Sequence, residues 1–233
     1  MVNNMKQKND NSIEKRVYEI IRKAILQRKL TPGMKISALS LSQEIGVSRT
    51  PVRLALQQLS AEGFVVMKAN KAAHVAKPSV RNIRELFYLR QVLESTAVTL
   101  ACQNVEKKDI KKLREINDLE GKTFKARDLS RYTDANEAFH LQIAKMADNE
   151  LLFETIEKLV AQSSIILSLF DPFYDFSKED EINYKKENEM LISFIENKAE
   201  KKAVDEIKQH IQRSLNNLSL DKLDELTSII PRL

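Results

Sequence analysis

Residues 41–62 read LSQEIGVSRTPVRLALQQLSAE, and this stretch decides the fold of the N-terminal part of the chain. The residue pattern predicts a short helix over Ser40–Ile45, and Gly46 supplies the permissive backbone that ends it. Ser48 is a natural N-cap for a second helix. Pro51 is tolerated in its first turn, because a backbone N–H has no helical partner there. The order of helix, tight turn and helix predicts a helix-turn-helix.

The second predicted helix has one apolar face and one basic face. Arg49 and Arg53 lie four residues apart, so both project from one side of its N-terminal half. The apolar positions recur at helical spacing and comprise Val52, Ala55, Leu56 and Leu59. A recognition helix presents cations and its own N-terminus to the DNA major groove in this manner. An ordinary helical hairpin with two solvated arginines is the alternative interpretation.

The residues that follow favour DNA binding. Residues 64–68 have the pattern of a β-strand, Ala69–Lys71 that of a turn, and Ala73–Ala76 that of a returning strand. A helix-turn-helix followed at once by a hairpin is a winged helix. The tip of this wing carries Asn70 and Lys71, which suit contact with phosphates or with the minor groove.

Organisation into two domains follows from charge and from apolar periodicity. An amphipathic helix over Ser12–Lys29 and a short strand over Met34–Ile36 complete a winged-helix domain at residues 12–77, after a polar tail at 1–11 that we expect to be disordered. Residues 1–78 hold 14 Lys+Arg and 5 Asp+Glu, a net charge of +9, whereas the remainder holds 24 and 28, a net of −4. A basic N-terminal domain is what neutralising DNA phosphates requires.

The rest of the chain has a helical pattern throughout. After a linker at 78–79, residues 80–233 predict an all-α bundle of six or seven helices. The expected fold is therefore mainly α with a small β wing. The expected helices span Val80–Asn104, Lys108–Phe124, Leu129–Ala147, Glu150–Phe170, Lys178–Asn197, Ala199–Leu218 and Asp221–Ile229.

Several classes of protein are disfavoured by what the sequence lacks. No run of about 18 apolar residues could cross a membrane, and MVNNMKQKND is not a signal peptide, so we expect a cytoplasmic protein with no membrane partner. The single cysteine, Cys102, excludes an intrachain disulfide framework. No glycine-rich phosphate loop, HExxH motif or nucleophile elbow is present, so we do not expect an enzyme.

The N-terminal motifs resemble those of the GntR family of bacterial transcription regulators. The resemblance lies in RKLTPGMKI (28–36), LSQEIGVSRTPVRLALQQLSAEGFV (41–65) and KANKAAHVAKPS (68–79), and VSRTPVR is close to the family signature. Family members contact operator DNA through residues that match Ser48, Arg49, Arg53 and Asn70. Together with their neighbours in the two motifs, the predicted DNA contacts are Ser48, Arg49, Thr50, Arg53, Asn70 and Lys71.

The C-terminal part resembles the FCD subgroup of that family, through Leu86–Ala101, Asp134–Leu152 and Glu187–His210. Bundles of this subgroup commonly hold a divalent metal through one carboxylate and three histidines. The matching positions here are Asn136, His140, Asn188 and His210. Two imidazoles and two neutral amides make a weak site, so zinc or nickel would be bound weakly, chiefly by His140 and His210. Ordinary core histidines are the alternative interpretation.

The same four residues are expected to line a polar pocket for a small carboxylate effector, because Asn and His can hydrogen-bond a carboxylate directly. Arg90 lies where members of the subgroup place a ligand-facing arginine, and it could clamp an organic acid. A salt bridge to Glu94, four residues on, satisfies the spacing equally well.

The sequence therefore predicts a ligand-responsive regulator that binds an inverted-repeat operator as a homodimer, with its affinity changed by a small organic acid. Two alternatives remain at this point. One is an architectural DNA binder with a purely structural bundle, and the other is a metal-containing enzyme bundle fused to a DNA-binding module.

Overall fold

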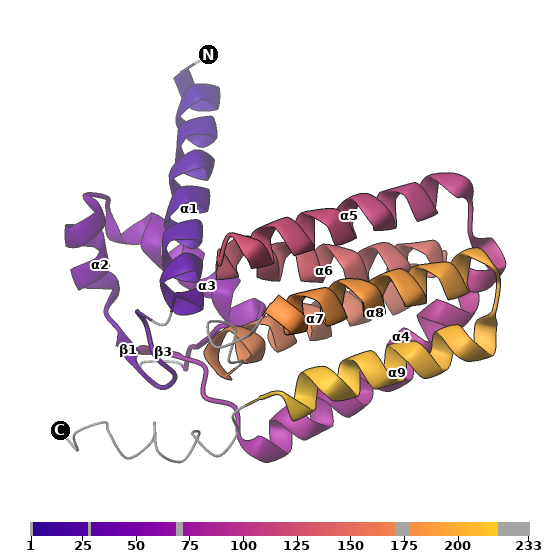
Figure 1. Cartoon of the computed structure of the whole chain (residues 1–233). Helices are drawn as coiled ribbons and strands as arrows, with labels where there is room; N and C mark the ends of the chain where they lie inside the picture. The colour runs from indigo at the N-terminus through magenta and orange to yellow at the C-terminus, as the bar shows by residue number, and fades with distance from the viewer. Residues whose placement is uncertain (1, 28, 69–71, 171–177, 219–233) are drawn as a thin grey trace. The chain divides into compact units, whose positions relative to one another are not determined.

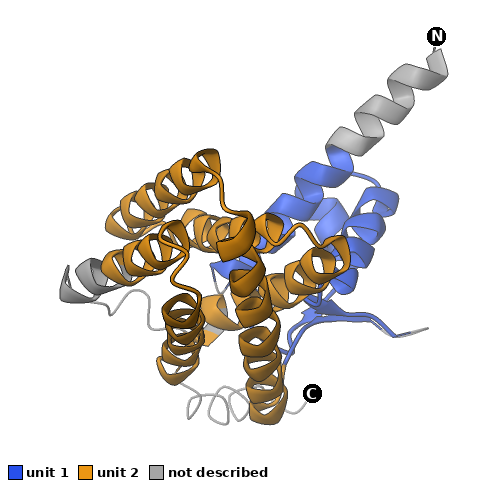
Figure 2. Cartoon of the chain, turned by 90° about the vertical axis from the view of Figure 1, so that its right-hand side faces the viewer, with its two compact units in different colours: residues 1–77 blue, residues 78–233 orange. Residues whose placement is uncertain are grey.

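The computed structural model describes residues 2–27, 29–68, 72–170 and 178–218. The chain divides into two compact units, unit 1 (Met1–Lys77) and unit 2 (Pro78–Leu233), coloured blue and orange in Figure 2. The mainly helical fold with a small β wing confirms the fold class that the sequence predicts.

Three helices form the body of unit 1, namely α1 (Val2–Leu26), α2 (Ala38–Ile45) and α3 (Arg49–Ala61). α1 packs against α3, and the buried side chains on the two helices include Val17, Ile21, Ile25, Val52, Leu56 and Leu59. α1 begins at Val2, so residues 2–11 are helical where the sequence pattern indicated a disordered tail. No proline or glycine occurs before residue 32 to interrupt this helix.

Three short strands form the wing of unit 1: β1 (Lys35–Ile36), β2 (Val65–Val66) and β3 (Ala73–Val75). Their order is β1-β3-β2 and both pairings are antiparallel, so β3 is the central strand. Ala73 and Val75 are buried, as the period of two predicts for one face of a sheet. The residues at the predicted tip, Asn70 and Lys71, lie outside the described residues.

Unit 2 is a helical bundle (Figure 1). Its described helices are α4 (Val80–Asn104), α5 (Lys107–Lys125), α6 (Leu129–Met146), α7 (Glu150–Phe170), α8 (Lys178–Glu196) and α9 (Glu200–Asn216). α4 packs against α6, α7 and α9, while α5 packs against α6 and α8. The helix expected over Asp221–Ile229 lies outside the described residues. None of the helices in the described ranges is long and apolar enough to cross a membrane.

Local capping explains where several of these helices begin. The Ser79 hydroxyl accepts a hydrogen bond from the Asn82 backbone N–H at 3.1 Å, at the start of α4. Asp128 caps α6 in the same way, accepting from the Arg131 N–H at 3.2 Å. Such caps satisfy backbone donors that lack partners in the first turn, which is why the sequence reveals these boundaries.

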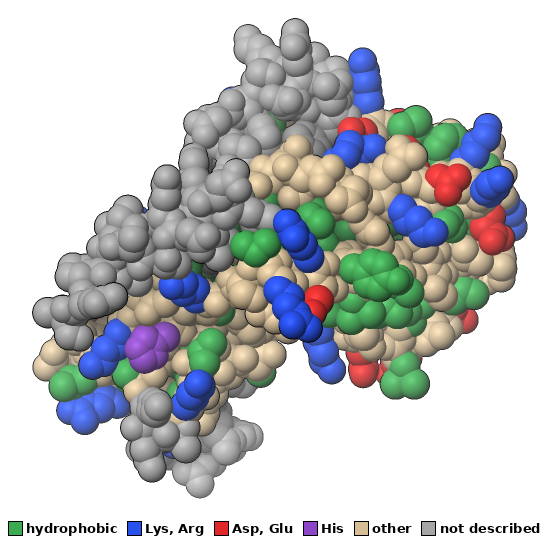
Figure 3. All heavy atoms as spheres, turned by 90° about the horizontal axis from the view of Figure 1, so that it is seen from below, with side chains coloured by type: hydrophobic (Ala, Val, Ile, Leu, Met, Phe, Trp, Pro, Cys, Tyr) green, Lys and Arg blue, Asp and Glu red, His purple; other side chains and the backbone are tan. Residues whose placement is uncertain are grey.

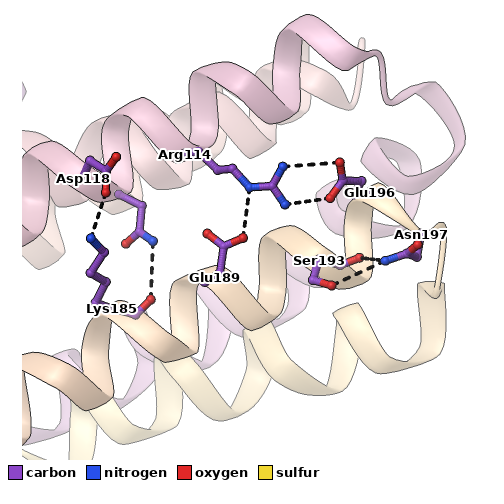
Figure 4. Close-up of polar contacts among 8 residues, drawn as sticks. Arg114, Asp118, Lys185, Glu189, Ser193, Glu196 and Asn197 are labelled. Atoms are coloured by element: carbon purple, nitrogen blue, oxygen red, sulfur yellow. Dashed lines mark hydrogen bonds and ion pairs between the residues drawn. The ribbon is translucent and has the colours of Figure 1, made fainter.

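Ion pairs on the surface join α5 to α8 (Figure 4). Arg114 contacts Glu189 at 3.0 Å and Glu196 at 2.7 Å, and Lys185 contacts Asp118 at 2.8 Å. Exposed pairs of this kind are worth little individually. These pairs connect the same two helices that carry the buried side chains Glu120 and Asn188.

Candidate DNA-binding surface and polar cluster

The helix-turn-helix of unit 1 has the geometry that its sequence predicts. Ser37 caps α2, accepting from the Ser40 N–H at 3.2 Å. Gly46 ends α2 with φ of +73°, a left-handed conformation that favours glycine. Ser48 then starts α3 as an extended N-cap residue.

The N-terminal end of α3 is open to solvent. Ser48, Arg49, Thr50 and Arg53 are all exposed, and the opposite face of α3 is buried against the unit. The Ser48 side chain makes no capping hydrogen bond, so its hydroxyl remains available. Figure 3 shows lysine and arginine side chains on unit 1. Exposed cations and hydroxyls at a helix N-terminus are suited to phosphate oxygens and base edges.

A second set of contacts fixes the far end of α3. The Tyr18 hydroxyl of α1 donates to the Glu62 carboxylate at 2.7 Å, and the Gln58 amide donates to the same carboxylate at 3.1 Å. The Phe64 N–H donates to the Leu59 carbonyl at 2.9 Å as the chain enters β2. These contacts tie the C-terminal end of α3 to α1 and to the wing, and so hold in place the helix whose N-terminal end is exposed.

The polar residues of interest in unit 2 come together in its interior. We call this set the polar cluster, and it consists of Arg90, Glu94, Glu120, Asn136, His140, Ser163, Asn188 and His210. Each of the helices α4 to α9 contributes at least one member. All members are buried except Asn136, which is half-buried. The structure thus brings together the five residues that the sequence assigned to an effector pocket.

Arg90 takes part in a buried chain of hydrogen bonds. Its Nε donates to Glu94 Oε1 at 2.6 Å and its Nη1 donates to the Ser163 hydroxyl at 2.7 Å. Glu94 Oε2 lies 2.6 Å from His140 Nδ1. Burial alone would raise the pKa of Glu94, but Arg90 and His140 outweigh it and lower that pKa to about 2. The carboxylate is therefore ionised, with both oxygens engaged.

The salt-bridge interpretation of Arg90 is thus the one that the structure shows. The pair differs from a common surface pair because both side chains are buried, at 3% and 4% exposure. Only Nη2 of the guanidinium has no hydrogen-bond partner. Arg90 can therefore offer one nitrogen to a ligand, and not the bidentate contact that two free nitrogens would make.

Glu120 is a member of the polar cluster that the sequence interpretation missed. Its Oε1 accepts from the Asn136 amide at 3.0 Å, and its Oε2 accepts from the Asn188 amide at 2.7 Å. Burial raises the pKa of Glu120 to about 7, although both amide hydrogen bonds act to lower it. A signal was present in the sequence, because Glu120 falls on the apolar stripe of α5, whose buried positions include Ile110, Leu113, Asn117, Glu120 and Phe124.

The two histidines lie together, with ring centroids 5.2 Å apart. Burial is the main reason that the pKa of His210 falls well below its usual value, so this ring is neutral. Beside it, Arg213 Nε lies 3.0 Å from Glu187 and its Nη2 lies 2.7 Å from Glu206. His210 therefore faces a second set of charged groups at the edge of the polar cluster.

Two small cavities adjoin the polar cluster. One, of about 20 Å³, is lined by residues that include Asn136 and His210. The other, of about 10 Å³, is lined by residues that include Glu120 and Asn188. Tyr132 lines both cavities. Each volume is close to what one water molecule needs, so a larger ligand must widen this space.

The four positions that match metal ligands of the FCD subgroup do not form a strong metal site. Asn136 and Asn188 both donate their amide N–H groups to Glu120, and the Glu94 carboxylate that contacts His140 also pairs with Arg90. No group of three His, Cys, Asp or Glu side chains suited to a metal occurs among the described residues. Neutral amide oxygens are poor partners for zinc, so these four side chains do not fit a tightly held divalent metal.

A winged helix followed by a helical bundle is the architecture of a class of two-domain DNA-binding regulators. The FCD domain matches residues 85–213, and the family described as bacterial regulatory proteins, gntR family, matches residues 13–75. The chain therefore belongs to the GntR family of transcription regulators, in its FCD subgroup.

Individual relatives agree with this assignment. The chain is 32% identical to the Nta operon transcriptional regulator of Aminobacter aminovorans over 130 residues, which cover 55% of this chain and 60% of that protein. It is 25% identical to the transcriptional repressor RspR of Escherichia coli over 149 residues, covering 64% and 65%. The chain thus matches less than two thirds of the length of these relatives.

Solved structures support the fold. E. coli McbR/YncC aligns with a TM-score of 0.71 at 21% identity, covering 92% of this chain and 98% of that one. A putative GntR regulator from Rhodococcus sp. RHA1 aligns with a TM-score of 0.69 at 21% identity, covering 94% and 99%. At this identity the likeness concerns the fold alone.

Proposed function

We propose that this protein binds an inverted-repeat DNA operator as a homodimer and changes its operator affinity when a small organic acid enters unit 2. The observation that carries the DNA-binding part is the exposed N-terminal end of α3, with Ser48, Arg49 and Arg53 open to solvent. These residues belong to the unit that also holds the excess of positive charge. Two such helices related by two-fold symmetry match two half-sites of an operator.

Arg49→Ala should weaken binding to the cognate operator by about 1–3 kcal/mol, because an arginine that reads a base edge contributes that much discrimination. Lys71→Ala should instead weaken operator and random DNA about equally and reduce the salt dependence. Fluorescence anisotropy at several salt concentrations, on an operator first selected from genomic DNA, measures both effects. Lys111→Ala removes an exposed cation of unit 2 and is the control. If Arg49→Ala and Arg53→Ala both bind the operator as tightly as the wild type does, α3 is not the recognition helix.

The dimer is proposed from an exposed apolar face of α4. Tyr88, Leu89 and Val92 are 69%, 42% and 44% exposed, and their spacing places them on one side of the helix. Figure 3 shows hydrophobic side chains gathered on unit 2. A second copy of the chain is the occupant that we propose for this face. A two-fold axis brings the same face of each subunit together, which is the arrangement that an inverted repeat requires.

A double substitution, Tyr88→Asp with Val92→Asp, should convert the dimer to a monomer and weaken operator binding. The introduced charges lose little in a monomer, where both sites face water, but are costly in an apolar interface. Analytical ultracentrifugation measures the mass, and circular dichroism checks the fold. Leu151→Asp is the matched control, because Leu151 of α7 is 77% exposed. A double variant that remains dimeric would exclude this face as the interface.

The effector part of the proposal is supported by the polar cluster. Arg90 Nη2 is a buried donor without a partner, and the neutral His210 lines a neighbouring cavity. A buried donor gains most from a ligand that accepts its hydrogen bond, such as a carboxylate. The acid can change operator affinity only if it binds one arrangement of the dimer more tightly than another. Any divalent metal held by His140 and His210 would be bound weakly.

A further inference from the structure

Two hydrogen-bonding atoms of opposite kind are left without partners in the polar cluster. Arg90 Nη2 is a donor, and Asn188 Oδ1 is an acceptor. Both residues are 2% exposed, so water from the surface does not satisfy these atoms freely. Buried polar atoms without partners are costly, and a ligand that pairs both of them removes that cost.

The unpartnered acceptor lies beside a carboxylate. Asn188 donates its amide N–H to Glu120, and both residues line the smaller cavity. The partners of Glu120 in the described structure are the neutral amides of Asn136 and Asn188. Glu94, by contrast, has an arginine on one oxygen and a histidine on the other. Of these two acidic side chains, Glu120 is therefore the one without a cationic partner.

Neighbouring charges do not already supply that cation. Lys185 lines the same cavity, but its ammonium group lies 2.8 Å from Asp118 and the side chain is 53% exposed. Arg213 pairs with Glu187 and Glu206. Within the described residues, the polar cluster and its edge thus hold four carboxylates against two guanidinium groups. A simple carboxylate ligand would add a further negative charge to this environment.

We infer that the effector of this bundle is an amino acid or a similar zwitterion, whose protonated amine binds Glu120 and Asn188 Oδ1 while its carboxylate accepts from Arg90 Nη2. This inference rests on the proposed function, because it names the chemical class of the same organic acid. Such a ligand carries a donor for Asn188 Oδ1 and an acceptor for Arg90 Nη2, and it adds no net charge. Each cavity is close to the size of one water molecule, so binding of an amino acid requires this space to widen.

Matched sets of probes test this inference on the full-length wild-type protein. The amino acids are glycine, L-alanine and L-serine. The hydroxy acids with the same skeletons are glycolate, L-lactate and glycerate, and the corresponding amines are methylamine, ethylamine and ethanolamine. Isothermal titration calorimetry gives each affinity at constant ionic strength, and operator binding is measured with and without each probe.

At least one amino acid should bind more tightly than its matched hydroxy acid and its matched amine, and should change operator affinity. Glu120→Gln keeps the size of the side chain but removes its charge. This variant should weaken amino-acid binding by about 10- to 100-fold, as expected for losing a hydrogen bond between charged groups, while hydroxy-acid binding is retained or improved. Glu115→Gln removes an exposed carboxylate from the same helix and should leave every affinity unchanged.

Each other outcome overturns a different part. Hydroxy acids that bind as tightly as their amino acids would overturn the amine assignment and leave the organic-acid effector intact. Amines that bind as tightly as the amino acids would show that the ligand's carboxylate makes no favourable contact with Arg90. No response to any amino or hydroxy acid would overturn the organic-acid effector and this inference together. A Glu120-dependent response to Mg²⁺ or Ca²⁺, in place of the amino acids, would identify a cation site instead.

Discussion

Replacing Arg90 with alanine is expected to destabilise unit 2 by about 3–5 kcal/mol, because removing one partner of a buried ion pair leaves the other charge uncompensated. Glu94 would keep His140 as a partner but lose the guanidinium that lies 2.6 Å from its Oε1. The Ser163 hydroxyl would lose its donor as well. Urea unfolding followed by circular dichroism measures the change in the free energy of unfolding.

The same helix provides a matched control for this effect. Arg81 and Glu85 form a pair with the same spacing at 2.7 Å, but their side chains are 86% and 56% exposed. Arg81→Ala should therefore cost no more than about 0.5 kcal/mol. Arg90→Met combined with Glu94→Gln should recover much of the loss, since no buried charge is then left alone. If Arg90→Ala and Arg81→Ala lower the free energy of unfolding equally, the Arg90–Glu94 pair does not stabilise the fold as a buried ion pair.

The second large effect is the pH dependence that Glu120 introduces. Its folded-state pKa of about 7 lies above its ordinary value of 4.5, because the carboxyl group is buried. The protonated form is therefore favoured in the folded protein, and its contribution to stability is fully present below pH 4.5. That contribution is lost as pH rises through 7 and should amount to about 3 kcal/mol, at 1.36 kcal/mol for each pKa unit.

Glu120→Gln removes this titration. The variant should gain stability relative to the wild type between about pH 4.5 and 7, with the difference levelling off at higher pH. The amide of Asn188 can turn its unpartnered Oδ1 toward the new glutamine N–H, so the variant should fold. Urea unfolding of both proteins from pH 4 to pH 8 measures the difference. A stability difference that does not vary with pH would show that Glu120 titrates normally.

Sequence patterns predicted the elements of this protein well where local signals set them. The helix over Val80–Asn104 begins at a serine cap. In the helix-turn-helix, Gly46 ends the first helix and Ser48 starts the second. Local rules of capping and of left-handed glycine operate within a few residues, so a single sequence reveals them. The start of α1 differs from the prediction, which placed it at Ser12, whereas the helix begins at Val2. No residue between these two positions is a proline or glycine that would stop a helix.

The polar cluster was predictable only in part, because its chemistry depends on contacts between distant residues. The five residues that resemblance assigned to a pocket lie together in the bundle interior, but Arg90 and His140 line neither of the two cavities. The partner of Asn136 and Asn188 is Glu120, which lies 16 and 68 positions away from them in sequence. Spacing alone allowed Arg90 either to bind an organic acid or to pair with Glu94. The structure shows the pair with Glu94, and both side chains are buried, which spacing does not reveal.

Every described helix of unit 2 contributes to the polar cluster, so the ligand preference that we propose depends on how these helices pack. A hydrogen bond weakens steeply when its angle or length departs from a narrow range, so a small shift of any one helix alters the cluster. Substitutions in the apolar layers between helices, such as those at Ala97, Ala144 or Val160, can therefore retune recognition without touching a ligand. Laboratory selection for a response to an effector other than the proposed one should yield altered-specificity variants scattered through the interior of the bundle. Specificity for the proposed effector would then be a property of the packing as a whole.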